Sequence, residues 1–171
     1  MKNNPRLVKL NRTPKDLEKW VNWLNNKDIL SFSEQRFSNH TIKTQKKFLT
    51  QKINSKTNII FKIIFNRKFI GTVELGNINK NHKTCEIMYF IGEENLWGRN
   101  IGTLAVKEAI FFAKKRLKMY KISAGTYSKN ISSQKVLLKN KFRIVGKQKK
   151  HFIMNENSGL RDDKILFERL L

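Results

Sequence analysis

Apolar positions along the chain follow two different periods, and each period predicts a different kind of element. Residues 58–65 are almost continuously apolar, whereas apolar and polar residues alternate in 69–75 and in 84–91. Alternation with a period of two puts the apolar side chains on one face of a strand, and short polar turns separate the three runs. The middle of the chain is therefore predicted to be an antiparallel meander of three strands.

Helical spacing appears before this meander. Thr13 and Pro14 are typical of a helix start, and Asp16 is predicted in the first turn. A second helix is predicted to begin near Thr41. The buried faces expected for these two helices are Leu17, Trp20, Val21 and Leu24, and then Ile42, Phe48, Leu49 and Ile53.

After the meander, strands and helices are predicted to alternate. The expected elements are a buried helix over 103–118, a strand over 121–127, a helix that opens at 130–133, and a hairpin of 143–153 with 164–171 around a turn at 155–159. With a short strand at 7–10, these elements predict an α/β (α+β) fold with about four helices. The sheet is expected to be mixed, mostly antiparallel, and built of about six to seven strands.

Length and composition fit one domain over residues 1–171. A chain of 171 residues with a 39% hydrophobic fraction is long enough for one well-packed domain and short for two. The single cysteine, Cys85, excludes an internal disulfide framework, and His40, His82 and His151 are too scattered for a metal site. No segment approaches the ~20 apolar residues of a membrane span, so we expect a cytoplasmic protein with no membrane partner.

The formal net charge is +23, which invites a nucleic-acid interpretation. The lysines, however, are spread over nearly every segment, with only a local cluster at Lys147, Lys149 and Lys150. A spread of this kind is more typical of a solvated surface than of a groove-reading stripe. It would still attract anionic cofactors and substrates.

Residues 97–105 join the meander to the long helix and contain two glycines, Gly98 and Gly102, with Arg99 between them. Glycine lets an anion approach the backbone, and the first turn of a helix offers free N–H groups with roughly half a positive charge. A plain tight turn is the alternative interpretation of the same residues.

Two carboxylates, Glu74 and Glu86, lie within the predicted meander of a chain that has 13 acids. On the pleat, Glu86 shares a face with Met88 and Phe90, and Glu74 shares one with Ile70 and Thr72. A carboxylate among apolar neighbours holds its proton more tightly, which suits a general base. Glutamates on an exposed sheet face are the alternative.

The order of these elements and two local motifs together resemble the Gcn5-related N-acetyltransferase superfamily over nearly the whole chain. The branch that includes ribosomal-protein alanine acetyltransferases is the most similar. In that superfamily a loop with the pattern Gln/Arg-x-x-Gly-x-Gly/Ala holds the pyrophosphate of acetyl-CoA, and residues 97–102 match it with Trp97 in the first position and Asn100 in place of the middle glycine.

Residues 130–142 are similar to the Asn-x-x-Ser-x-x-Val-Leu-Glu-Lys-x-Gly-Phe segment of the same branch. The resemblance implies that Asn130 binds the pantetheine arm and that Ser133 lies beside the thioester sulfur. Leu137 stands where many members have a tyrosine acid, so Ser133 is the better candidate for helping the thiolate leave. Leu138 and Lys141 are further departures, expected at the surface.

The implied reaction is direct attack of a deprotonated amine on the thioester, with a splayed pair of strands holding acetyl-CoA. Backbone groups of Phe90 and Ile91 would polarise the carbonyl, Glu86 or Glu74 would accept the proton, and no metal is required. The cofactor-binding residues implied are Phe90, Ile91, Trp97, Gly98, Arg99, Asn100, Ile101, Gly102, Thr103, Asn130 and Ser133. Cys85 is expected to pack within its strand and to form no covalent intermediate.

The acceptor implied is a small amine, and an anionic amino-sugar nucleotide of a surface-polysaccharide pathway agrees best with the basic surface. A polyamine agrees with it poorly. The N-terminus of a ribosomal protein is the alternative acceptor, and a protein that binds acetyl-CoA or nucleic acid without turnover is a further alternative. We expect a monomer or a homodimer.

Overall fold

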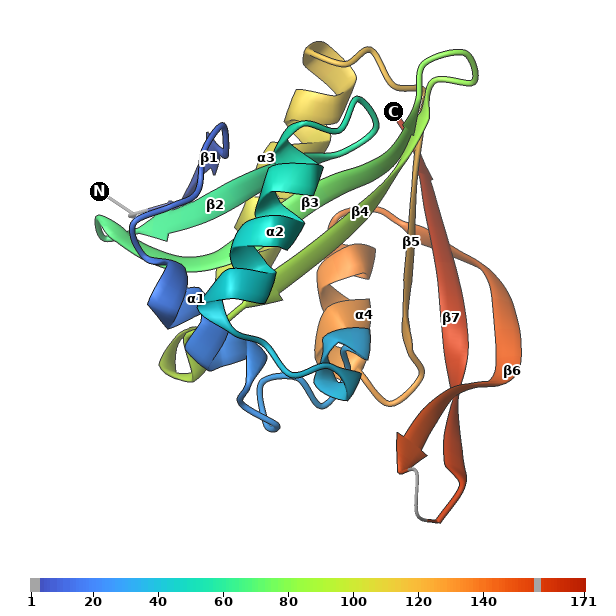
Figure 1. The fold of residues 1–171 in the computed structure, drawn as a ribbon. Helices are drawn as coiled ribbons and strands as arrows, with labels where there is room; N and C mark the ends of the chain where they lie inside the picture. The colour runs from blue at the N-terminus through green and yellow to red at the C-terminus, as the bar shows by residue number, and fades with distance from the viewer. Residues whose placement is uncertain (1–3, 156–157) are drawn as a thin grey trace.

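The computed structural model describes residues 4–155 and 158–171, in which seven strands form one sheet (Figure 1). The strands are β1 (Arg6–Lys9), β2 (Ile59–Phe65), β3 (Lys68–Asn79), β4 (Thr84–Ile91), β5 (Lys121–Tyr127), β6 (Arg143–Asn155) and β7 (Leu160–Leu170). The helices are α1 (Leu17–Leu24), α2 (Ile42–Ile53), α3 (Ile101–Lys115) and α4 (Ile131–Lys139), with short 3₁₀ turns η1 (Glu34–Phe37) and η2 (Glu94–Leu96).

The sheet order is β1-β2-β3-β4-β5-β7-β6, and every neighbouring pair is antiparallel except β4 with β5. A parallel pair needs a crossover, and α3 supplies it across one face of the sheet. The predicted fold is confirmed in its class, its strand number, its mixed pairing and its helix number.

Helices cover both faces of the sheet, which gives the protein two apolar cores. Figure 1 shows α1 and α2 in front of the sheet and α3 behind it. The front core includes Trp20, Trp23, Leu49 and Phe69. The rear core is larger and includes Val73, Ile87, Ala105, Val106, Ile122, Leu137 and Phe167.

The two halves of the sheet meet at a short seam. β4 and β5 pair only at Thr84–Lys121, Cys85–Ile122 and Glu86–Ser123, although both strands continue beyond these residues. The strands then diverge toward their carboxyl ends, and α4 is seen between them in Figure 1. The seam therefore opens at the end of the sheet where the loop before α3 and the start of α4 also lie.

Element boundaries differ from the predictions in a few places. Asp16 is the N-cap of α1 rather than a first-turn residue, because Trp20 N–H donates to its carbonyl at 3.2 Å and opens the helical ladder. Ile42 is exposed because the inner face of α2 runs through Gln45 and Leu49. α3 begins two residues earlier than expected and ends at Lys115.

The final hairpin also differs in extent. β6 runs to Asn155 and β7 begins at Leu160, so both strands are longer than predicted near the turn. Of the predicted turn at 155–159, residues 156 and 157 lie outside the described part of the chain.

Candidate active site

The loop before α3 contains two residues with a positive φ, Gly98 and Asn100. Asn100 is the N-cap of α3 and has φ 64° and ψ 5°, which is the left-handed region. Gly98 also has a positive φ, of 74°, and a Cβ at this position would meet no atom within 4 Å. Asn100 thus occupies a conformation that glycine adopts without strain and asparagine tolerates.

The first turn of α3 is left without a side-chain cap. Asn100 makes no capping hydrogen bond, whereas Thr41 caps α2 and Asn130 caps α4. The N–H groups of Ile101, Gly102 and Thr103 belong to this uncapped turn, and such groups attract phosphate oxygens. The residues present therefore fit the pyrophosphate of acetyl-CoA.

Replacing Asn100 with glycine is expected to tighten acetyl-CoA binding or leave it unchanged, and to stabilise the protein by up to about 1 kcal/mol, because glycine relieves the strain of a positive φ. Calorimetric titration and thermal unfolding measure the two effects. Asn77, which has φ 48° on the remote end of β3, is the matched control, and Asn77→Gly should alter stability alone. Weaker acetyl-CoA binding by Asn100→Gly would mean that the asparagine side chain contacts the ligand.

Trp97 ties this loop to the end of β4. Its indole Nε1–H donates to the carbonyl of Ile91 at 2.9 Å, while its ring is about half exposed. Arg99 is exposed in the same loop, where a guanidinium can approach a phosphate. The Trp97–Ile91 hydrogen bond thereby fixes the position of the loop relative to the end of β4.

The N–H of Ile91 in β4 points toward β5, the strand that diverges from β4. Gly92 N–H donates to Ile70 of β3 at 2.9 Å, and Phe90 stands opposite Thr72 of the same strand. Because successive residues of a strand direct their backbone groups to opposite sides, the N–H of Ile91 points away from β3, toward the side that β5 has left. Ile91 is therefore better placed than Phe90 to meet a ligand between the strands.

The start of α4 brings two predicted residues together. The Asn130 Oδ1 accepts a hydrogen bond from the Ser133 N–H at 3.0 Å, so Asn130 caps the helix and fixes Ser133. Leu137, one turn further along, is fully buried and has no group that could donate a proton. The expected role of Asn130 toward pantetheine stays a prediction.

Sequence reasoning missed Tyr89. Its hydroxyl donates to Ser133 Oγ at 2.9 Å, and burial raises the pKa of Tyr89 to about 12 although the hydrogen bond with Ser133 lowers it. The alternation in β4 could have indicated it. Tyr89 carries a hydroxyl on the strand face that it shares with Cys85, Ile87 and Ile91.

The two candidate bases lie on one face of the sheet, in different surroundings. Glu74 stands opposite Met88, and Glu86 stands opposite Gly76, which places both on the side of α1 and α2. Glu74 forms an ion pair with Lys52 at 2.6 Å, whereas Glu86 is exposed. The prediction that both carboxylates have apolar surroundings is therefore wrong. Lys52 of α2 pairs with Glu74, and Glu86 is exposed to water.

Cys85 lies inside the rear core with 2% of its surface exposed. Burial, followed by the charge of Glu86, raises the pKa of its thiol to about 11. A thiol in this state is a poor nucleophile, which agrees with the packing role expected from the sequence.

Aromatic and charged side chains gather at the end of β5. The Tyr127 ring stacks on Phe152 with centroids 3.7 Å apart, and its hydroxyl donates to Glu34 of η1. Arg36 covers the other part of this cluster, with its guanidinium 5.3 Å from the Tyr127 ring and hydrogen-bonded to the Ile153 carbonyl. The segment between α1 and α2 thus joins the front layer to the final hairpin.

A buried carboxylate fixes the turn between β5 and α4. Burial alone would raise the pKa of Asp162, but hydrogen bonds from Ser128 Oγ at 2.6 Å and from the Lys129 N–H at 3.0 Å hold it below its usual value. Gln134 also donates to the Ser128 carbonyl, at 2.7 Å. These bonds secure the backbone that carries Ser133.

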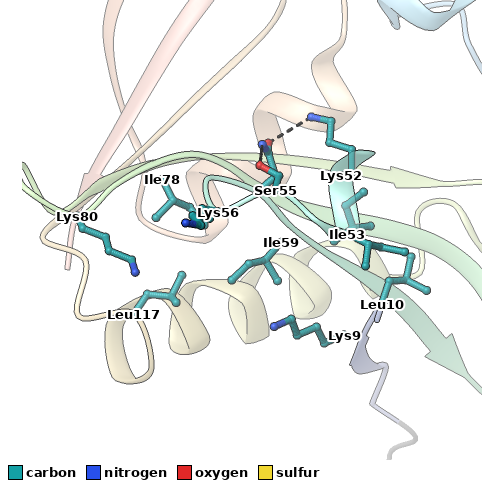
Figure 2. Close-up of a pocket in the computed structure, with 12 residues that line it drawn as sticks. Lys9, Leu10, Lys52, Ile53, Ser55, Lys56, Ile59, Ile78, Lys80 and Leu117 are labelled. Atoms are coloured by element: carbon teal, nitrogen blue, oxygen red, sulfur yellow. Dashed lines mark hydrogen bonds between the residues drawn. The ribbon is translucent and has the colours of Figure 1, made fainter. Parts of the chain in front are cut away.

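A small hollow of about 220 Å³ lies elsewhere, between the ends of α2 and α3 (Figure 2). Lys9, Lys52, Lys56 and Lys80 line it together with apolar side chains such as Ile59. None of the predicted site residues contributes to its wall. It is therefore separate from the site at the open end of the β4–β5 seam.

Metal-ligating clusters and membrane-spanning helices are both absent from the described residues. Within residues 4–155 and 158–171, no three or more His, Cys, Asp or Glu side chains gather where they could hold a metal ion. None of the helices in this part of the chain combines the length and the apolarity needed to cross a bilayer.

Comparison with known proteins decides the family, because the model of the acetyltransferase (GNAT) domain matches residues 6–143. The chain belongs to the GNAT acetyltransferase family. The protein is thus an acetyl-CoA-dependent N-acetyltransferase, with acetyl-CoA as the co-substrate that the uncapped α3 start fits.

Solved structures show how widely this fold is shared. A spermidine N-acetyltransferase from Vibrio cholerae, in complex with CoA and spermine, has a TM-score of 0.85 at 20% identity and covers 98% of this chain and 95% of its own. RimL, a ribosomal α-N-protein acetyltransferase in complex with coenzyme A, also scores 0.85, at 15% identity and with coverage of 100% and 96%. A microcin self-immunity acetyltransferase, MccE, in complex with acetyl-CoA and AMP scores 0.80, at 21% identity and with coverage of 100% and 94%.

Proposed function

We propose that this acetyltransferase acetylates the primary amine of an amino sugar carried on a nucleotide. The observation that carries the proposal is the cluster at the end of β5, where the Arg36 guanidinium and the rings of Phe37, Tyr127 and Phe152 lie together. Phe37 is 45% exposed and Phe152 is half-buried, so these two rings can stack on a sugar or a base, whereas Tyr127 is buried. The Arg36 guanidinium donates to the carbonyls of Ser31 and Ile153 and supplies a positive charge that suits phosphate. The MccE structure, which contains AMP with acetyl-CoA, supports a nucleotide as part of the acceptor.

Ion pairing on the front face argues against a polyamine acceptor. Asp16 pairs with Lys62, Glu74 with Lys52 and Glu93 with Lys19. Glu34 is hydrogen-bonded to Tyr127. A polycation would have to displace these partners on a protein of net charge +23, so an anionic acceptor is favoured.

The proposed mechanism assigns four tasks to residues of β4, α4 and the loop before α3. The Ile91 N–H stabilises the negative charge that develops on the carbonyl oxygen, and Glu86 accepts the amine proton through water, with Glu74 as the alternative base. Ser133 donates a hydrogen bond to the sulfur as the carbon–sulfur bond breaks. Residues 97–103 hold the pyrophosphate and so position the thioester.

Acetyl-CoA at about 100 times its dissociation constant is expected to stabilise the protein by about 2.7 kcal/mol. Thermal unfolding with and without the ligand measures this effect, with adenosine alone as the matched ligand that lacks the pyrophosphate and the arm. An unchanged melting temperature at millimolar acetyl-CoA would contradict the proposed cofactor site.

An acceptor screen tests the substrate. A 4-amino sugar nucleotide should give a kcat/KM at least about tenfold above that of a peptide with an N-terminal alanine, and spermidine should be the poorest of the three. Release of CoA thiol measures each rate. Preference for the peptide would favour ribosomal-protein acetylation, for which the likeness to RimL is the specific observation.

A further inference from the structure

Tyr89 spans the interior of the site, from β4 to the first turn of α4. Its hydroxyl lies 2.9 Å from Ser133 Oγ and 3.3 Å from the Ser133 carbonyl oxygen. We infer that Tyr89 is the residue that orients Ser133, by donating to Ser133 Oγ and so leaving the serine proton directed at the thioester sulfur. This inference rests on the role proposed for Ser133.

Packing gives the tyrosine little freedom. A Cβ placed on Gly102, in the first turn of α3, would lie 3.7 Å from the Tyr89 ring and 3.7 Å from Val136 of α4. The ring therefore sits where the starts of both helices meet the strand. A side chain held between three elements can define the rotamer of its hydrogen-bond partner.

Ser133 itself is fixed from the other side. Its N–H is held by Asn130 Oδ1 at 3.0 Å, so the serine backbone does not need the tyrosine for its position. What Tyr89 adds is the direction of the hydroxyl. A phenol is the stronger donor of the two hydroxyls, and the raised pKa of about 12 keeps Tyr89 protonated at neutral pH.

In the transfer step, the nitrogen–carbon bond forms and the carbon–sulfur bond breaks. The electron pair of the broken bond goes to sulfur, and the amine proton goes to the carboxylate base. Tyr89 and Ser133 keep their own protons and act only as hydrogen-bond donors. Leu137 is buried and has no polar group, so it cannot supply a donor in place of this hydroxyl pair.

The experiment compares the binding of CoA and desulfo-CoA, which differ only in the thiol, by calorimetric titration at pH 7 and pH 9. A thiol with a pKa near 8.5 is largely ionised at the higher pH, and an aligned hydroxyl should then favour CoA by about tenfold. Tyr89→Phe and Ser133→Ala should each remove most of this preference. The double variant should lose no more than either, because coupled groups are not additive.

Two controls show that the cofactor site is intact. Each variant should bind desulfo-CoA with the wild-type dissociation constant, and Tyr120→Phe, which removes a hydroxyl from a residue 59% exposed, should keep the full preference. In turnover, Tyr89→Phe should lower kcat by about tenfold with an unchanged KM for acetyl-CoA.

Other outcomes overturn the inference in distinct ways. A full thiol preference in Tyr89→Phe would mean that the tyrosine only packs, and a faster variant would mean that Ser133 donates to Tyr89 instead. If the wild type bound both ligands equally at pH 9, the role of Ser133 would fail while the cofactor site remained. If the wild type bound neither ligand, the proposed cofactor site would fail as well.

Discussion

Replacing Glu86 with glutamine is expected to lower kcat by about 100- to 10,000-fold, the range over which general-base catalysis acts. The dissociation constant for acetyl-CoA should not change, because the glutamate lies on the front face, away from the uncapped start of α3 that we propose as the pyrophosphate site. Glutamine keeps the size of the side chain and removes its negative charge together with its ability to accept a proton. Initial rates and calorimetric titration of acetyl-CoA measure the two quantities.

Two further variants make this test specific. Glu74→Gln removes the other candidate base, whose carboxylate is already engaged by Lys52, and should cost much less activity. Glu108→Gln, at an exposed position of α3, controls for the loss of one negative charge. Full activity of Glu86→Gln with a large loss in Glu74→Gln would transfer the role to Glu74. Full activity in both would leave proton removal to water.

Replacing Gly71 with alanine is expected to destabilise the protein by about 3 kcal/mol or more and to lower its melting temperature by roughly 6–12 °C. A Cβ at this position would lie 2.1 Å from the Phe90 carbonyl oxygen and 2.9 Å from the Ile91 Cα. Both are backbone atoms of β4, so no side chain can move aside and the strands must separate. Thermal unfolding without ligand measures the effect.

Gly102→Ala is the matched control for Gly71→Ala. The nearest atoms to its added Cβ are 3.7 Å away, which is ordinary contact, and alanine favours a helix by about 0.5–1 kcal/mol. Its melting temperature should be equal to the wild type or higher. A melting temperature for Gly71→Ala within 2 °C of the wild type would contradict the steric argument. A difference that small corresponds to a destabilisation of at most about 1 kcal/mol.

Local periodicity was sufficient for the elements of this fold. β4 and β5 have the bounds that alternation predicts, and α1 buries Leu17, Trp20, Val21 and Leu24 as expected. Boundaries failed where apolar spacing does not show the backbone conformation, as in the earlier start of α3. There, Asn100 adopts a left-handed conformation that lets Ile101 begin the helix.

The site was predictable where one segment carries it. The loop at 97–103 and the Asn130 cap of α4 are properties of short runs of sequence. The Lys52–Glu74 ion pair and the Tyr89–Ser133 hydrogen bond join residues 22 and 44 positions apart, so no local pattern could reveal them. The same holds for Glu34 and Tyr127, which are 93 positions apart.

The short seam between β4 and β5 has a consequence for the protein without its co-substrate. Beyond Glu86 and Ser123, the facing edges of β4 and β5 are not paired with any strand in residues 4–155 and 158–171. Free strand edges are templates for association with other chains. A bound pantetheine arm would cover these edges. Saturation with acetyl-CoA should therefore slow aggregation on storage, and the enzyme should lose activity faster when acetyl-CoA is absent.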